Sequence, residues 1–436
     1  MEDYLPLLMF PALLLFLLSG YPVAFVLSGV ALLFAALGTY LDIFYWQDLG
    51  FIPTRVFGII SNFTLLAVPL FVFMGITLEK SGVAESLLKS ISQLFHGFRG
   101  SLAIAVVAVG ALLAASTGIV GATVVTMGVL SLPTMIQSGY DKRLATGTIA
   151  ASGTLGQIIP PSIVLVLLGD MMNVDVGDLF AGAIIPGLLL VLFYAFYVLL
   201  KSRGQSASSA MSEDTRASWQ ELLSALAPPL LLVILVLGTI LGGLASPTEA
   251  ASCGATGALI IALWKGKFSW DLIRQVSQET VQTTSMVFMI LLGAQFFGVV
   301  FRGLHGDELI VDVIDQLALS KYWILFALML LLFILGFFLD FLEICFIVIP
   351  IIMPIMTGLG FDPLWLAILI AVNLQTSFLT PPFGFALFYL KGVAPKDIKT
   401  MDIYRGVLPF VGIQMLALVL ITVFPQLVLW LPKIVF

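Results

Sequence analysis

Two long apolar runs constrain this chain more than any other feature. Residues 101–137 and 322–358 each exceed the roughly 20 residues that one helix needs to cross a bilayer, yet neither can hold two crossings and a loop. The first is interrupted by small residues at 114–118, and the second around Gly336, Asp340 and Glu343. Non-helical backbone persists at membrane depth only where protein or a water-filled cavity covers it. Each run is therefore predicted to be a re-entrant helical hairpin.

The composition places the rest of the chain in lipid as well. Hydrophobic residues make up 60% of the 436 residues and charged residues only 10%, against roughly 25% in soluble domains. This predicts an all-α polytopic membrane protein with about ten crossings. The other apolar segments are 4–19, 22–38, 56–78, 143–168, 179–200, 226–243, 248–264, 281–301, 363–390 and 407–431. Cys253 and Cys345 lie inside apolar runs, so neither a disulfide nor a metal framework is expected.

The two halves of the chain form a repeat. With an offset of 221 residues, positions 133–161 share 8 identities in 29 with the second half, without a gap. The matches include a Pro-Pro pair and a Gly-aromatic-Asp turn: Pro160-Pro161 with Pro381-Pro382, and Gly139 and Asp141 with Gly360 and Asp362. Proline removes a backbone donor and breaks a helix, so each half is predicted to carry one broken helix at mid-membrane.

The basic residues predict that the repeats are inverted. An N-terminus outside the cell, with both hairpins returning to their own side, puts 15 of the 19 Lys and Arg residues inside and 4 outside. The hairpins then enter from opposite sides, a plan common among secondary transporters. The chain begins with Glu2 and Asp3 rather than a basic segment, so the first apolar run is expected to be a retained helix.

The polar groups near the breaks favour ion binding rather than catalysis. Prolines free the backbone carbonyls at 156–159, and free carbonyls at the end of a half-helix suit a hard cation such as sodium. Asp340 and Glu343 lie one helical turn apart at the second hairpin tip, where they can face water or help to hold an ion. The only histidines are His96 and His305, neither is beside a nucleophile, and there is no P-loop. The sequence therefore predicts no enzyme, no ATP hydrolysis and no nucleic-acid partner.

Several motifs together resemble one family. They are SNFTLLAVPLFVFMG at 61–75, the small-residue tip near Ser116, LPTMIQSGYDKRLA at 132–145, LGQIIPPS at 155–162, SPTEAA at 246–251 and LTPPFG at 379–384. At these motifs the chain is similar to the large (DctM-type) membrane subunit of tripartite ATP-independent periplasmic (TRAP) transporters. Residues 380–395 look most like the branch labelled for mannitol and chloroaromatic compounds, whose members are associated with 2-oxo acids and other small carboxylates.

The resemblance implies an elevator fold of the ion-transporter superfamily. It implies sodium symport of a small organic anion (a carboxylate such as a 2-oxo or hydroxy acid) into a bacterium across its inner membrane, with Na+ as coupling ion and no organic cofactor. The implied partners are a small four-helix membrane subunit, a periplasmic substrate-binding protein and membrane lipid. The implied division is 1–100, scaffold and an inner arm; 101–168, transport half 1; 169–321, scaffold, linker 201–220 and an outer arm; 322–390, transport half 2; and 391–436, a C-terminal helix.

Matching positions give expected site residues. The first sodium site comprises Ser116, Thr117, Gly156, Ile159 and Pro160. The second comprises Gly336, Asp340, Thr376, Thr380 and Pro381. Substrate contacts are expected from Thr117, Ser162, Gln375, Ser377 and Pro382. The first tip reads STGIVGAT, where the family more often has a Ser-Gly-Ser-Ser type run. The polar run at 375–377 departs from the small apolar residues that are more common there. A stand-alone carrier without a binding protein, an intramembrane enzyme and a channel remain as alternatives.

Overall fold

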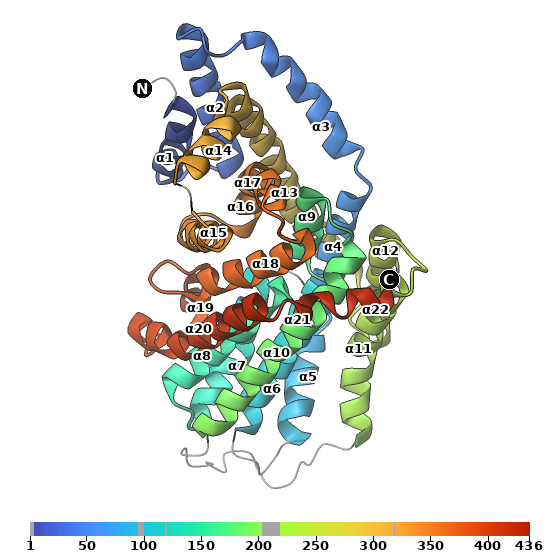
Figure 1. Ribbon diagram of the computed structural model, residues 1–436. Coiled ribbons are helices and arrows are strands. Elements are labelled where there is room, and N and C mark those ends of the chain that lie inside the picture. Colours follow the sequence, from blue (N-terminus) through green and yellow to red (C-terminus); the bar gives the residue numbers. More distant parts are fainter. Residues whose placement is uncertain (1–3, 95–99, 118–119, 203–218, 318) are drawn as a thin grey trace.

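The computed structural model describes residues 4–94, 100–117, 120–202, 219–317 and 319–436, and these residues form helices without strands, as predicted (Figure 1). The first half contains α1 (Leu5–Leu17), α2 (Val23–Tyr40), η2 (Trp46–Phe51), α3 (Ile52–Ile60), η3 (Thr64–Leu66), α4 (Ala67–Lys80), α5 (Val83–Leu94), α6 (Ser101–Thr117), α7 (Val120–Gln137), α8 (Lys142–Thr154), η4 (Leu155–Gln157), α9 (Ile163–Met172) and α10 (Val176–Ser202). The second contains α11 (Trp219–Leu241), α12 (Pro247–Trp264), α13 (Trp270–Gly303), α14 (Gly306–Leu317), α15 (Lys321–Leu335), α16 (Phe341–Ile347), α17 (Ile349–Gly358), α18 (Pro363–Leu379), α19 (Phe385–Val393), α20 (Thr400–Val423), α21 (Gln426–Leu429) and α22 (Pro432–Val435).

The helix boundaries follow the predicted repeat. Adding 221 to the ends of α7 gives 341 and 358, the first residue of α16 and the last of α17. The same shift carries the start of α8 onto the start of α18, and the end of α9 onto the end of α19. Both Pro-Pro peptide bonds are cis, and Gly139 and Gly360 both have positive φ. The hairpins and broken helices are therefore structural copies.

The repeat extends well beyond the aligned 29 positions. Under the same shift, the starts of α2, α5 and α10 fall within three residues of the starts of α12, α14 and α20. The short helices α5 and α14 hold equivalent places in the two halves. The repeat thus includes helices outside the hairpins and broken helices.

One region departs from its predicted form. The run at 56–78 was expected as one apolar segment, but α3 and α4 are separated by η3 and their axes bend by 58°. The side chain of Asn62 stabilises the bend: its oxygen accepts from the Thr64 N–H at 2.9 Å, and its amide donates to Asp170. A polar side chain that satisfies exposed backbone donors ends a helix locally. The corresponding run in the second half is the single helix α13, which begins at Trp270 rather than at 281.

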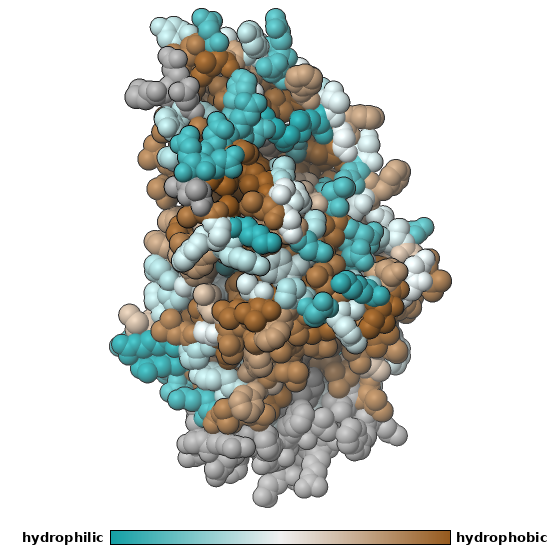
Figure 2. Space-filling model, viewed as in Figure 1, coloured by the Kyte–Doolittle hydropathy of each residue, from teal (hydrophilic) through white to brown (hydrophobic). Residues whose placement is uncertain are grey.

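Long apolar helices face outward into lipid. Among the described residues, six helices are long and apolar enough to cross a membrane, or eight if each bent pair counts as one span. Along α10, Leu188, Leu192 and Phe196 recur every four residues and are each more than half exposed. An exposed apolar stripe of this kind indicates that the helix contacts the hydrocarbon of the membrane. Figure 2 shows broad apolar areas on the face that includes α10 and α20.

The helices pack in two groups that meet around the centre. In one group α2 and α4 pack against α13, and α4 also packs against α12. In the other, α8 packs against α6, α7 and α20, while α18 packs against α10, α15 and α20. The groups touch where α4 meets α6 and α9, and where α13 meets α16 (Figure 1). In that view, α6 and α7 lie below the centre and α16 above it.

Candidate functional site

A central cavity of about 100 Å³ lies where the two helix groups meet. Each hairpin contributes to its wall: Val120 and Gly121 begin α7, and Asp340 and Phe341 begin α16. Residues flanking both Pro-Pro breaks complete this side, with Gln157 and Ile163 from one half and Phe378 and Phe385 from the other. Val72 of α4 and Thr283, Met286 and Val287 of α13 close the opposite side. The structure thus brings both hairpins and both broken helices to one place.

Gln157 is the unusual polar residue of this cavity. It is fully buried, yet neither its side-chain oxygen nor its nitrogen has a hydrogen-bond partner among the described residues. Leaving a buried amide unpaired costs about 1–3 kcal/mol, and native structures rarely do so without a bound water, ion or ligand. Its orientation at the wall of the cavity makes it a candidate contact for a bound molecule.

Asp340 plays a structural part at the second tip. Its carboxylate accepts from the Phe341 N–H at 2.8 Å, and its own N–H donates to the Glu343 carboxylate at 3.0 Å. Together they form a capping box at the start of α16. The two acidic residues are therefore in contact across the first turn of α16, and Asp340 also lines the cavity.

Three of the residues expected at the first sodium site lie at the first break. Gly156 and Pro160 are buried, and Ile159 is half-buried. The backbone of Ser116 and Thr117 forms the last turn of α6, but their side chains lie outside the described part of the structure, as does Gly118. Their approach to the break therefore stays a prediction.

At the second site the hydroxyls bond to backbone. Thr376 donates to the Val372 carbonyl at 2.8 Å, and Thr380 donates to the Thr376 carbonyl at 2.7 Å. Gly336 ends α15 against Ser377, and a Cβ on Gly336 would lie 2.2 Å from the Ser377 Oγ. This close approach explains why the interruption in the hairpin needs glycine. Pro381 lies half-buried at the break itself.

Four of the expected substrate contacts lie elsewhere in the structure. Ser162 donates to the Gln157 carbonyl at 2.9 Å, and Ser377 donates to the Phe333 carbonyl at 3.0 Å. Gln375 donates to Thr154, and the Pro382 carbonyl accepts from Tyr404. None of these four lines the central cavity. Their expected role stays a prediction for another state of the protein.

Some residues that line the cavity were not predicted, although the sequence contains an indication of one of them. Thr283 belongs to a polar run, Gln-Thr-Thr-Ser at 282–285, in the middle of an apolar helix. Tyr389 lines the cavity from α19, and its ring lies so close to Gly121 that a Cβ there would be 3.0 Å from it. Polar residues inside membrane helices are costly unless they are paired or functional, so the polar run could have marked α13.

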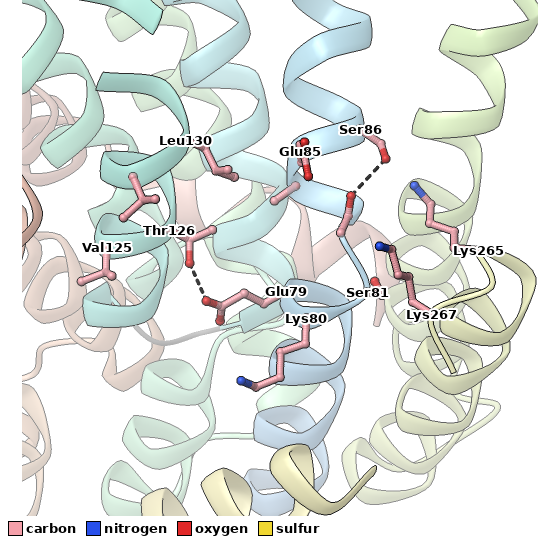
Figure 3. Close-up of a pocket in the computed structure, with 13 residues that line it drawn as sticks. Glu79, Lys80, Ser81, Glu85, Ser86, Val125, Thr126, Leu130, Lys265 and Lys267 are labelled. Atoms are coloured by element: carbon pink, nitrogen blue, oxygen red, sulfur yellow. Dashed lines mark hydrogen bonds between the residues drawn. The ribbon is translucent and has the colours of Figure 1, made fainter. Parts of the chain in front are cut away.

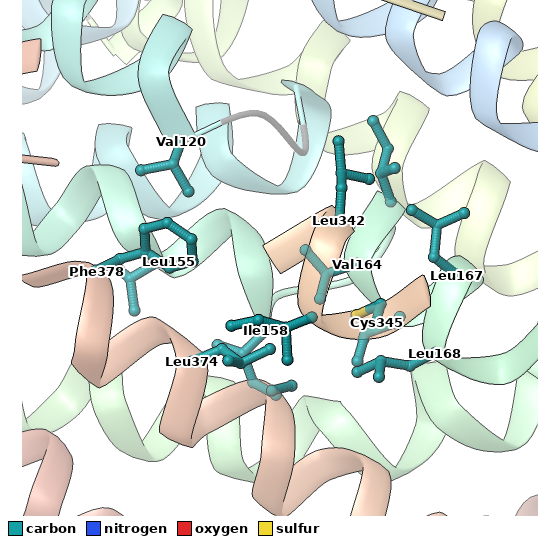
Figure 4. Packing of buried hydrophobic residues seen from close by; sticks show 14 of the residues in the cluster. Val120, Leu155, Ile158, Val164, Leu167, Leu168, Leu342, Cys345, Leu374 and Phe378 are labelled. Atoms are coloured by element: carbon teal, nitrogen blue, oxygen red, sulfur yellow. The ribbon is translucent and has the colours of Figure 1, made fainter. Parts of the chain in front are cut away.

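Apolar packing makes the base of the site rigid. Figure 4 shows Cys345 of α16 beside Val164 and Leu168 of α9, with Ile158 and Leu374 close by. All five side chains are fully buried. Both cysteines of the chain are free. The second hairpin is thus locked to the first broken helix through a close-packed apolar contact.

A larger open cavity of about 670 Å³ lies further along the first hairpin, beside residues 125–130 of α7. Its walls are the junction of α4 and α5, the α7 helix, and the two lysines after α12, Lys265 and Lys267 (Figure 3). Thr126 of α7 donates to the carboxylate of Glu79 on α4, and Lys80 pairs with Glu279 at 2.8 Å. The Thr126–Glu79 bond directly joins the hairpin to the other helix group.

The sequence family is clear from comparison with known proteins. The family model described as "Tripartite ATP-independent periplasmic transporter, DctM component" matches residues 10–427. The C4-dicarboxylate TRAP transporter large permease protein DctM of Vibrio cholerae is 32% identical over 400 residues, covering 86% of each chain. The sialic acid TRAP transporter large permease protein SiaM of the same organism is 30% identical over 427 residues, covering 96% of each. The proteins in this comparison are transporters, which excludes the intramembrane enzyme.

Solved structures share the fold at low sequence identity. The YdaH transporter of Alcanivorax borkumensis superposes with a TM-score of 0.65 at 14% identity, covering 88% of this chain and 90% of that one. MtrF of Neisseria gonorrhoeae superposes with a TM-score of 0.56 at 13% identity, covering 88% and 84%. These similarities support the duplicated helical architecture described above. By its sequence match over nearly the whole length, the chain belongs to the DctM family of TRAP transporter large permease subunits.

Proposed function

We propose that this subunit carries out sodium-coupled import of a small organic anion, handed over by a periplasmic binding protein, through an elevator movement. The observation that carries the proposal is the central cavity, where both hairpins and both Pro-Pro breaks meet and the buried Gln157 amide has no partner in the described part of the chain. Inverted-repeat transporters hold substrate and ions at such a meeting point of broken helices.

Sodium coupling rests on the chemistry of the two breaks. The first site would use Ser116, Thr117, Gly156, Ile159 and Pro160, and the second Gly336, Asp340, Thr376, Thr380 and Pro381. Backbone carbonyls and hydroxyls are the neutral oxygen ligands that hard cations accept. Two equivalent breaks offer two equivalent places for an ion. Each would place its cation at the edge of the cavity, where it can offset the charge of an anion.

The packing suggests which helices move together. We assign α10 and α20 to the moving group because they pack against each other and against α8 and α18. The expected division of the chain puts α10 in the scaffold and α20 in a separate C-terminal segment. The packing instead favours adding both helices to the moving group. The scaffold would then comprise α2, α4, α12 and α13, which face the cavity through Val72 and Thr283.

The remaining assignments follow from family membership and charge. A small four-helix membrane subunit and a periplasmic binding protein are the expected partners, and the bacterial inner membrane is the expected location. The basic-residue bias favours a periplasmic N-terminus, and with that orientation the open cavity beside α7 would face the cytoplasm.

The test is uptake by proteoliposomes that contain this subunit, the small subunit and the binding protein. We expect uptake that requires an inward sodium gradient and saturates with substrate. Pro160→Ala and Thr380→Ala should raise the sodium concentration needed for half-maximal uptake, while membrane insertion is retained. Undiminished uptake without the binding protein would support the stand-alone carrier, and non-saturating flux independent of sodium would support a channel.

A further inference from the structure

The helices α4 and α7 connect the central cavity with the open cavity beside α7. On α4, Val72 lines the central cavity and Glu79 lines the open one. On α7, Gly121 lines the central cavity and Thr126 lines the open one. These residues are seven and five positions apart, which at about 1.5 Å per residue is a distance of about 10 Å or less along each helix. The two cavities therefore follow one another along the same helices.

The helix α13 passes both cavities as well. Its residue Thr283 lines the central cavity. One turn before it, Glu279 pairs with Lys80 at 2.8 Å, and Lys80 lines the open cavity. All three helices thus run from the central cavity to the level of Lys80, although α13 does so in the opposite chain direction.

Two polar contacts hold the three helices together where the cavities adjoin. The carboxylate of Glu79 accepts from Thr126, which joins α4 to α7. The next residue, Lys80, pairs with Glu279 and joins α4 to α13. Figure 3 shows Glu79 directed at Thr126, and the Lys80 amine directed away from the two lysines that follow α12. A molecule that moves from one cavity to the other between these helices must pass both contacts.

Lys80 is the first basic residue on this route. Residues 67–79 of α4, 101–137 of the first hairpin and 275–301 of α13 contain no Lys or Arg. The two lysines after α12 also line the open cavity. An anion that leaves the central cavity between these helices therefore meets Lys80 before any other cation that they carry.

The two partners of the ion pair differ in exposure. The side chain of Glu279 is 49% exposed, and that of Lys80 is 26% exposed. A charge that reaches water loses little when its partner leaves, whereas a less exposed charge loses more. An arriving carboxylate can therefore replace Glu279, because the displaced side chain is solvated and Lys80 keeps a partner.

We propose that the transported anion passes between α4, α7 and α13 to reach the open cavity, and that Lys80 binds its anionic group on the way, in exchange for Glu279. The inference rests on the proposed function, since it takes an anion as the cargo. It adds a transit site that is separate from the ion sites at the two breaks. It also assigns the side of release, which is the side of the turn between α12 and α13.

The test uses small charged thiol reagents, so that it does not depend on the identity of the natural cargo. Met286→Cys places a thiol at the wall of the central cavity, in a chain that carries Cys253→Ser. The permease with its small subunit is held in sealed vesicles of either orientation. The reagents are the anionic 2-sulfonatoethyl methanethiosulfonate and the cationic 2-(trimethylammonium)ethyl methanethiosulfonate. Trp270→Cys marks the vesicle face on which α13 begins, because Trp270 is 82% exposed.

The ratio of the anionic to the cationic labelling rate measures the preference of the route for anions. We expect Met286→Cys to be labelled from the same face as Trp270→Cys. Glu279→Gln should raise the ratio at least threefold, because it removes the competitor for Lys80. The double variant Lys80→Gln with Glu279→Gln should lower the ratio at least threefold below that of the parent, although the net charge of the pair is unchanged.

Asp397→Asn is the control, because it removes the same charge as Glu279→Gln. Asp397 forms an ion pair with Lys142 at 2.7 Å and lines neither cavity. Its labelling ratio should equal that of the parent. A double variant with the parental ratio would show that the pair acts only through its net charge, which overturns the exchange. Labelling only from the face opposite to Trp270→Cys would overturn the route.

Uptake in sodium and in choline separates this inference from the proposed function. The labelling requires neither sodium nor the binding protein. Uptake that is independent of sodium would count against the proposed coupling, while the labelling ratios would still decide the role of Lys80. Sodium-dependent uptake together with a ratio that Glu279→Gln leaves unchanged would overturn the inference and leave the proposed function standing.

Discussion

The amide of Gln375 donates a hydrogen bond of 3.4 Å to the hydroxyl of Thr154, and these two residues are 221 positions apart, the same offset that relates the repeats. Equivalent residues of two copies can touch only near the axis that relates them. Thr154 ends α8, and Gln375 lies near the end of α18, so the pseudo-twofold axis passes between the broken helices just before each break. Tyr194 of α10 and Gln414 of α20 lie beside this contact and are fully buried.

The axial contact gives a prediction about stability. Gln375→Ala removes the bond to Thr154 and leaves a void between four helices, at a cost of about 2–4 kcal/mol. We expect a clearly lower thermal midpoint for the purified protein in detergent. Gln282→Ala is the control, because Gln282 is exposed on α13. Equal midpoints for the two variants would show that the axial pair does not hold the halves together.

The glycine at the second hairpin gives a sharper test. A Cβ at Gly336 would meet Ser377 at 2.2 Å, so Gly336→Ala should displace the hairpin at a cost of about 1–3 kcal/mol and slow uptake severalfold. Gly358→Ala, at the other end of the same hairpin, meets nothing within 4 Å and should behave as wild type. Adding Ser377→Gly to Gly336→Ala should restore part of the loss. A double variant as impaired as Gly336→Ala alone would place the cause elsewhere.

Much of this architecture could be predicted because its signals are local and strong. The Pro-Pro pairs and the length of each hairpin run fix where helices end, whatever packs around them. The offset of 221 predicted correctly that α7 would be matched in the second half, although there the helix is divided into α16 and α17. The bend at Asn62 was not predicted, because it depends on a contact with Asp170, more than one hundred positions away.

The site was harder to predict than the fold, because it too depends on contacts between residues that are far apart in the sequence. Ser377 and Gln375 were chosen as polar residues in an apolar run, but helix rotation turns one toward the Phe333 carbonyl and the other toward the axis. The sequence predicts a role for the backbone carbonyl of Gln157, whereas in the structure this residue lines the cavity and its amide is unpaired among the described residues. Which face of a broken helix meets the cavity is decided by tertiary packing, and a single sequence does not record it.

The Thr126–Glu79 bond predicts a shift between conformations. It joins the first hairpin to α4, so it stabilises the arrangement in which the cavity beside α7 is open. Thr126→Val should destabilise that arrangement by about 1 kcal/mol, which lowers its population relative to the other conformation about fivefold. The readout is the labelling rate of Val129→Cys, an exposed position in the same cavity, with Cys253 replaced by Ser. We expect slower labelling in Thr126→Val.

Thr134→Val provides the control for this comparison. Thr134 lies on the same helix and is exposed, and its hydroxyl bonds only to the Leu130 carbonyl within α7 among the described partners. We expect its labelling rate to equal that of the parent. If both threonine variants label Val129→Cys at the parental rate, the Glu79 contact does not bias the movement.

Asp340 allows a structural role and an ion-binding role to be separated in one experiment. Asn caps a helix about as well as Asp, so Asp340→Asn should retain the start of α16 and the thermal midpoint. Asp340→Ala should lose the cap at a cost of about 1 kcal/mol. If the carboxylate also helps to hold sodium, both variants should need at least tenfold more sodium for half-maximal uptake, because each removes the charge. An unchanged sodium requirement in Asp340→Asn, with a lower midpoint in Asp340→Ala alone, would restrict Asp340 to capping and remove it from the second sodium site.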